Sequence, residues 1–142
     1  MKRILLVDDD REIVASTAEL LQAFGYEVTA CADADRVLEM MHSKRPDIVL
    51  HDVRMPGLDL QAQLCAIHDD PDVGHTPVVL FTAVLSAKEL AEEVGADDAI
   101  EKPFDSETLR RVLRDCGARK RHTAKMRLEP ADQKGIVRMG EE

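Results

Sequence analysis

The first apolar run of the chain ends in three consecutive aspartates: residues 4–10 read ILLVDDD. A short apolar run between polar stretches is typical of a strand that is buried on both faces of a sheet. The pattern recurs at residues 47–52, which read DIVLHD. Two buried strands that each end in aspartate predict a sheet with acidic groups gathered at one edge.

Apolar runs and amphipathic stretches alternate from this first run to about residue 117. Further runs lie at residues 26–31 and 77–81 and, more weakly, at 99–100. The alternation predicts parallel βαβ units. We therefore expect an α/β fold, with a doubly wound, flavodoxin-like sheet of five parallel strands in the order 2-1-3-4-5 and helices on both faces.

The stretches between the runs carry apolar residues at helical spacing. Asp9 and Asp10 favour a helix that begins after the first run, and Gly25 favours its end. Leu90 and Val94 mark a shorter helix. Ser106 is the expected N-cap of the last one. The apolar positions that define the first and last helices are Ile13, Thr17, Leu20, Leu21 and Phe24, and Leu109, Val112, Leu113 and Cys116.

Charge divides the 142-residue chain into two parts. Residues 1–117 hold 24 acidic and 12 basic side chains, whereas residues 118–142 hold 4 and 7. The acidic part argues against nucleic acid as a partner. We interpret residues 1–117 as one domain and residues 118–142 as a basic helical extension with a flexible tail, whose charges continue a solvated helix face.

The sequence contains no targeting or disulfide signal. No apolar run approaches the roughly 18 residues of a membrane span, and residues 4–7 are too few for the core of a signal peptide. We expect a cytoplasmic protein without membrane contact. Cys31, Cys65 and Cys116 are odd in number and far apart, so we expect free thiols that are buried or half-buried.

Polar side chains stand where four of the predicted strands end. In the expected strand order, Asp9 and Asp52 follow neighbouring strands about 4.8 Å apart. Two such charges about 4 Å apart repel by roughly 4 kcal/mol at an effective dielectric constant near 20. Mg²⁺, which prefers oxygen ligands, would remove that repulsion. Thr82 supplies a hydroxyl, and Lys102 is long enough to bring a positive charge to Asp52.

Together these groups are the parts required for phosphoryl transfer onto a carboxylate. The sequence at this point resembles the receiver domain of bacterial two-component response regulators, which includes the single-domain chemotaxis regulator. The resemblance covers residues 2 to about 117 and is carried by four stretches: ILLVDDD at 4–10, DIVLHDVRMPG at 47–57, VVLFTA at 78–83, and GADD at 95–98 with KPF at 102–104.

The resemblance implies a role for each site residue. Asp52 would be the phosphoacceptor. Asp9 would bind Mg²⁺ directly and Asp8 would support the bound ion. The Arg54 carbonyl would complete the metal site. Thr82 and Lys102 would contact the phosphoryl oxygens. A cis peptide is implied before Pro103. The implied donor is a sensor histidine kinase or a histidine phosphotransfer protein, and the output is contact with a downstream protein target.

Several alternatives stay open. The chain is either a stand-alone regulator or phosphorelay intermediate, which we favour, or the N-terminal piece of a longer DNA-binding transcription regulator. We expect self-phosphorylation and self-dephosphorylation only, with no separate substrate. An Mg²⁺-dependent phosphatase with an aspartate nucleophile uses the same groups, but no cap insertion is present. A flavodoxin-like flavin protein would need a hydroxyl-rich phosphate loop, where this chain has three aspartates. His51 is expected to be a packing residue on the face opposite Asp52.

Overall fold

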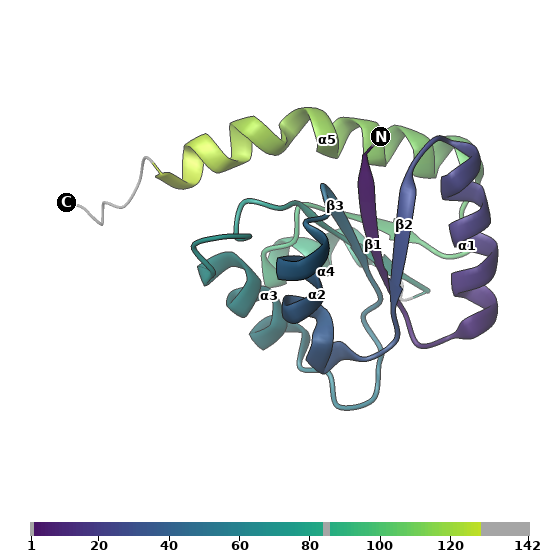
Figure 1. Ribbon diagram of the computed structural model, residues 1–142, viewed down its shortest axis with the longest axis horizontal. Coiled ribbons are helices and arrows are strands. Elements are labelled where there is room, and N and C mark those ends of the chain that lie inside the picture. The colour runs from purple at the N-terminus through teal and green to yellow at the C-terminus, as the bar shows by residue number, and fades with distance from the viewer. Residues whose placement is uncertain (1, 84–85, 129–142) are drawn as a thin grey trace.

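The computed structural model describes residues 2–83 and 86–128, and side chains up to residue 117. Strands and helices alternate along the chain (Figure 1). Their bounds are β1 Arg3–Val7, α1 Arg11–Ala23, β2 Glu27–Cys31, η1 Ala34–Arg36, α2 Val37–Lys44, β3 Ile48–His51, α3 Leu60–Asp69, β4 Val78–Thr82, α4 Ala87–Val94, β5 Asp98–Glu101 and α5 Ser106–Leu128.

The five strands form one parallel sheet in the order β2-β1-β3-β4-β5, as predicted. The register pairs Val7 of β1 with His51 of β3. Because parallel strands in register end at the same edge, the residues that follow, Asp8 and Asp52, leave the sheet side by side. The backbone itself therefore brings two of the predicted site residues together.

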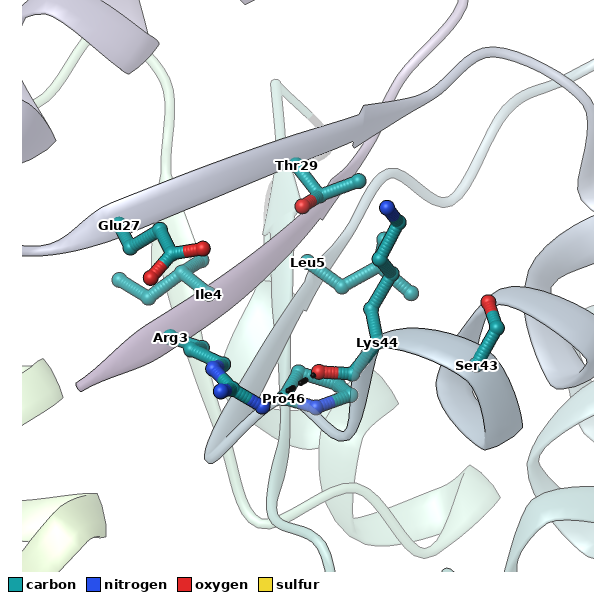
Figure 2. Close-up of a pocket in the computed structure, with 8 residues that line it drawn as sticks. All are labelled: Arg3, Ile4, Leu5, Glu27, Thr29, Ser43, Lys44 and Pro46. Atoms are coloured by element: carbon teal, nitrogen blue, oxygen red, sulfur yellow. Dashed lines mark hydrogen bonds between the residues drawn. The ribbon is translucent and has the colours of Figure 1, made fainter.

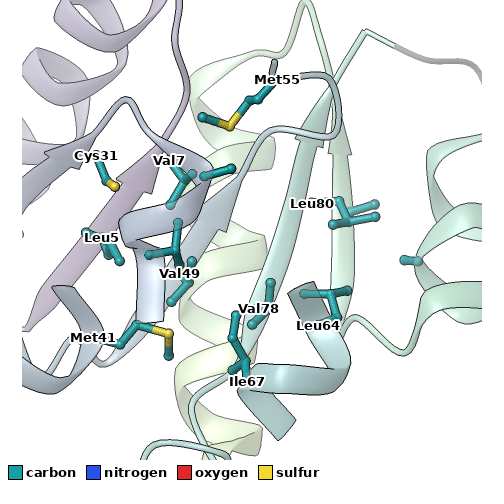
Figure 3. Close-up of a cluster of buried hydrophobic side chains, with 14 of the residues drawn as sticks. Leu5, Val7, Cys31, Met41, Val49, Met55, Leu64, Ile67, Val78 and Leu80 are labelled. Carbon is teal, nitrogen blue, oxygen red and sulfur yellow. The ribbon is translucent and has the colours of Figure 1, made fainter. Parts of the chain in front are cut away.

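Helices cover both faces of the sheet because the three central strands, β1, β3 and β4, bury side chains on both faces. On one face, side chains from β1, β3 and β4 pack against α2, α3 and α4 in a buried cluster (Figure 3). On the other face, Ile4, Leu6 and Phe81 belong to a second cluster with α1 and α5. Burying apolar side chains on both faces stabilises the sheet and leaves its carboxyl edge as the place for polar groups.

Aspartate carboxylates cap the N-termini of the first and last helices. Asp10 caps α1, where its Oδ1 accepts from the N–H groups of Glu12 and Ile13 at 3.0 and 3.3 Å. The predicted cap of α5 is wrong by one residue. Ser106 is already helical, and Asp105 accepts from the Thr108 N–H at 2.7 Å. An aspartate carboxylate is as good a cap as a serine, so the local sequence left the choice open.

The short helix marked by Leu90 and Val94 is present as α4, and one prediction about burial, that of Cys65, needs correction. In α4 the fully buried residues are Ala87 and Ala91, whereas Leu90 is only half-buried. Small side chains let this short helix lie close to the sheet, and the larger ones lie at its margin. Cys31 and Cys116 are buried thiols as expected, but Cys65 is exposed on α3.

The extension predicted after residue 117 is helical as far as the structure describes it, because α5 continues to Leu128. Figure 1 shows its last turns running past the sheet. The predicted tail beyond residue 128 lies outside the described residues. The domain boundary at residue 117 stays a prediction.

Candidate functional site

A cleft of about 270 Å³ opens at the carboxyl edge of the sheet, between the ends of β1, β3, β4 and β5. It collects every site residue that the sequence predicts. Its lining residues are Asp8, Asp9, Asp10, Ile13, Asp52, Arg54, Thr82, Ala83 and Lys102. Residues up to 94 positions apart in the chain meet here because parallel strands deliver their ends to one edge.

The three consecutive aspartates have three different environments. Asp8 is buried, and its Oδ1 accepts from the Asp10 N–H at 3.0 Å. Asp9 is exposed at the mouth of the cleft. The carboxylate of Asp10 is occupied in capping α1. The three residues span the connection between β1 and α1, so one acidic run supplies a buried carboxylate, an exposed one and a helix cap.

Asp52 is almost fully buried beside Asp8. Its Oδ1 accepts from the Val53 N–H at 2.9 Å. Burial raises the pKa of the Asp52 carboxyl above its ordinary value; the positive charge of Lys102 opposes the rise, and the negative charge of Asp8 adds to it. The Asp52 carboxylate is therefore largely shielded from solvent and held in a defined position by a backbone donor and a nearby cation.

Lys102 lies between the two buried carboxylates. Its Nζ is 2.9 Å from Asp8 Oδ2 and 3.7 Å from Asp52 Oδ1. The lysine therefore reaches Asp52, as predicted from the sequence, but contacts Asp8 more closely. Its Nζ also lies 4.5 Å from the centre of the Phe81 ring, a cation–π contact. Sequence reasoning missed Phe81, which is indistinguishable from the other apolar residues of its strand.

The remaining predicted residues close the cleft. Thr82 ends β4 and is buried at the cleft wall, and Arg54 lies in the connection between β3 and α3, two residues after Asp52. The peptide bond between Lys102 and Pro103 is cis, as the resemblance implies.

The donor set suits a hard divalent cation. Carboxylate oxygens of Asp8, Asp9 and Asp52 lie within 4.8 Å of one another. All three are oxygen ligands, and the cleft is open on the side of Asp9, which leaves room for the water molecules that Mg²⁺ retains. These three carboxylates fit Mg²⁺, and Arg54 lines the same cleft.

His51 is buried, as expected for a packing residue, but it also has specific partners. Its Nδ1 is 2.6 Å from the Asp52 carbonyl oxygen, and its Nε2 is 3.3 Å from Nε2 of Gln63 on α3. Burial lowers the pKa of the imidazole, and the hydrogen bond to the backbone opposes that shift. Neither partner was predicted, because the contact with Gln63 joins two elements that the sequence does not orient relative to each other.

A second hollow, of about 190 Å³, lies near the amino ends of β1 and β2 (Figure 2). The Arg3 guanidinium lines it and donates to the Lys44 carbonyl oxygen at 3.1 Å. None of the predicted site residues lines this hollow. The chemistry expected from the sequence is thus confined to the carboxyl edge. Among the described residues, no helix combines the length and apolar character needed to cross a bilayer.

Comparison with known proteins agrees with this geometry. A family model described as the response regulator receiver domain matches residues 4–114. The transcriptional regulatory protein CseB of Streptomyces avermitilis is 36% identical over 149 residues, covering 97% of this chain and 60% of that protein. The chemotaxis protein CheY4 of Vibrio cholerae has a TM-score of 0.74 at 30% identity, covering 82% of this chain and 98% of that chain.

A third match bears on the metal. The receiver domain of the sensor histidine kinase PA1611 from Pseudomonas aeruginosa PAO1, solved with a magnesium ion coordinated in its active-site cleft, has a TM-score of 0.74 at 28% identity. It covers 82% of this chain, and 98% of that chain is matched. The chain spans about half the length of the curated relatives it matches, between 44% and 60% for three of them.

Proposed function

The chain belongs to the family of response regulator receiver domains of two-component signalling, and from that premise we propose that Asp52 accepts a phosphoryl group from a phosphohistidine. The observation that carries the proposal is the cluster of Asp8, Asp9 and Asp52 with Lys102 within 3.7 Å of the acceptor carboxylate. The three carboxylates outnumber the one lysine, so they repel one another unless a further cation joins them.

The transfer exchanges one bond to phosphorus for another. A carboxylate oxygen of Asp52 attacks the phosphorus, the bond from phosphorus to the histidine nitrogen of the donor breaks, and the imidazole leaves with its electron pair and takes up a proton. Asp8, Asp9 and Asp52 with the Arg54 carbonyl would hold Mg²⁺, which when bound would neutralise charge on the phosphoryl oxygens. Lys102 and the Thr82 hydroxyl would donate hydrogen bonds to those oxygens.

The donor would be a sensor histidine kinase or a histidine phosphotransfer protein, and the acyl phosphate would change the contacts made with a downstream protein target. The chain would catalyse only its own phosphorylation and dephosphorylation, in the cytoplasm. A phosphatase acting on a separate substrate is not favoured, because the family match accounts for the same residues.

Two forms of output are compatible with this acceptor. In the first, a stand-alone regulator or relay intermediate acts through protein contacts alone; the excess of acidic over basic residues in positions 1–117 argues against nucleic acid as its own partner. In the second, the chain is the N-terminal piece of a longer transcription regulator, and the helical extension of α5 leads to the next domain. The greater length of the curated relatives supports the second form.

Intact-mass measurement after incubation with acetyl phosphate and Mg²⁺ tests the acceptor. The wild-type chain should gain the mass of one phosphoryl group, Asp52→Asn should gain none, and Asp69→Asn, at an exposed acid of α3, should behave as the wild type. An adduct on Asp52→Asn at wild-type yield would refute the assignment. Turnover of para-nitrophenyl phosphate by the unmodified chain would contradict the absence of a separate substrate.

A further inference from the structure

His51, the last residue of β3, is fully buried directly before the proposed acceptor. A buried imidazole is costly unless both ring nitrogens have partners. Here Nδ1 lies 2.6 Å from the Asp52 carbonyl oxygen and Nε2 lies 3.3 Å from Gln63 Nε2. These contacts link β3 to α3 directly beneath the phosphorylation cleft.

The contacts of Gln63 determine the tautomer of His51. The Gln63 side chain also meets the Ala34 carbonyl oxygen at 2.8 Å. A carbonyl oxygen only accepts, so the Gln63 atom that faces it must be the amide nitrogen, which donates. The same nitrogen faces His51 Nε2, which therefore accepts. The proton of the neutral imidazole is then on Nδ1, and Nδ1 donates to the Asp52 carbonyl oxygen.

The bond from His51 acts on a peptide unit that also contacts the acceptor carboxylate. The carbonyl of Asp52 and the N–H of Val53 are opposite edges of one planar peptide. His51 holds the carbonyl edge, and the N–H edge donates to Asp52 Oδ1 at 2.9 Å. A rotation of this peptide would move the donor away from the carboxylate. Fixing one edge therefore fixes the other.

On the basis of the proposed role of Asp52, we infer that His51 is a positioning residue for the phosphoacceptor and that Gln63 holds His51 in the tautomer this requires. Gln63 of α3 joins the Ala34 carbonyl oxygen of η1 to the imidazole of His51 in β3. His51 in turn contacts the peptide that orients the Asp52 carboxylate. These contacts reach Asp52 through the peptide that follows it, so their effect is on the orientation of its carboxylate.

Two substitutions at His51 separate positioning from packing. In His51→Asn the amide nitrogen Nδ2 is bonded to Cγ, as Nδ1 is in histidine, so the variant keeps an N–H donor. In His51→Leu the side chain keeps its apolar bulk but has no donor. We expect His51→Leu to slow phosphorylation by acetyl phosphate at saturating Mg²⁺ by roughly three- to ten-fold, the range that one hydrogen bond supports, without changing the half-saturating acetyl phosphate concentration. His51→Asn should stay within about two-fold of the wild type.

A second pair of variants tests the link to α3 and keeps the test available if His51→Leu does not fold. Gln63→Leu should slow phosphorylation in the same sense as His51→Leu. Its matched control is Gln61→Leu, the same change at an exposed position two residues earlier on α3, which should leave the rate unchanged. Equal rates in the two glutamine variants would refute the role of Gln63.

Amide hydrogen exchange at Val53, measured by NMR, reports on the peptide without any phosphorylation. Exchange should be faster in His51→Leu than in the wild type and in His51→Asn. If Val53 exchange and the phosphorylation rate are the same in the Leu and Asn variants, the inference is wrong. If the wild type itself takes no phosphoryl group at Asp52 but Val53 responds as expected, the proposed acceptor is wrong while the relay of contacts stands.

Discussion

Replacing Lys102 with glutamine tests the electrostatics of the cleft directly. The side chain of Lys102 is 15% exposed, and the side chains of its partners Asp8 and Asp52 are 1% and 11% exposed. The substitution Lys102→Gln keeps most of the side-chain bulk and removes the one positive charge that contacts these two carboxylates in the described structure. Asp8 and Asp52 are then left close together and unpaired.

The distances set the size of the expected effect. At an effective dielectric constant near 20, the Lys102 contacts of 2.9 and 3.7 Å correspond to about 6 and about 4 kcal/mol of attraction. Removing the lysine also removes the cost of burying its ammonium group, which offsets most of this sum. Breaking one side of a buried ion pair typically costs roughly 3–5 kcal/mol. We expect Lys102→Gln to lower the free energy of unfolding by about 3 kcal/mol in metal-free buffer.

Mg²⁺ should reverse most of this loss, because the ion takes over the neutralisation of the same carboxylates. At saturating Mg²⁺ we expect the deficit to shrink to about 1 kcal/mol. The difference of about 2 kcal/mol is a coupling free energy, so by linkage Lys102→Gln should bind Mg²⁺ roughly 30-fold more tightly than the wild type.

Urea unfolding followed by far-ultraviolet circular dichroism, in EDTA and in Mg²⁺, measures both quantities without a tryptophan. The matched control is Lys88→Gln, which removes a shorter ion pair, 2.6 Å to Asp98, from a lysine that is 70% exposed. The control should cost less than about 1 kcal/mol in both buffers. Equal destabilisation of the two variants in EDTA, or a deficit of Lys102→Gln that Mg²⁺ leaves unchanged, would refute the role of Lys102 between the two carboxylates.

Three further predictions follow from other parts of the structure. Asp9→Ala should weaken Mg²⁺ binding in calorimetry more than Asp8→Ala, since Asp9 faces the open side of the cleft; equal affinities would contradict this. Asp105→Ala should cost about 1 kcal/mol in urea unfolding and Ser106→Ala only a few tenths, and the reverse order would restore Ser106 as the cap. Burial lowers the pKa of His51, so on acidification the unfolded chain takes up this proton before the folded protein does. The free energy of unfolding should therefore fall between about pH 7 and pH 5, less steeply in His51→Leu; identical slopes would rule this out.

Local sequence was enough to place the residues of the site at one edge of the sheet. Apolar runs identified the strands, and parallel strands in a doubly wound sheet bring their carboxyl ends together whatever the details of packing. The positions of Asp52, Thr82 and Lys102 in one cleft follow from that rule alone. The same information predicted the strand order and the covering of both faces by helices.

The tertiary structure decided how those residues are paired. Three identical side chains in a row became a buried partner of Lys102, an exposed carboxylate and a helix cap, because each points into a different neighbourhood. The cap at Asp105 instead of Ser106 likewise depends on how the chain leaves β5 to enter α5. Burial and hydrogen-bond direction depend on which distant segment lies opposite, and no local pattern carries that information. The contact of His51 with Gln63 exists only because α3 packs against the sheet with Gln63 facing the last residue of β3.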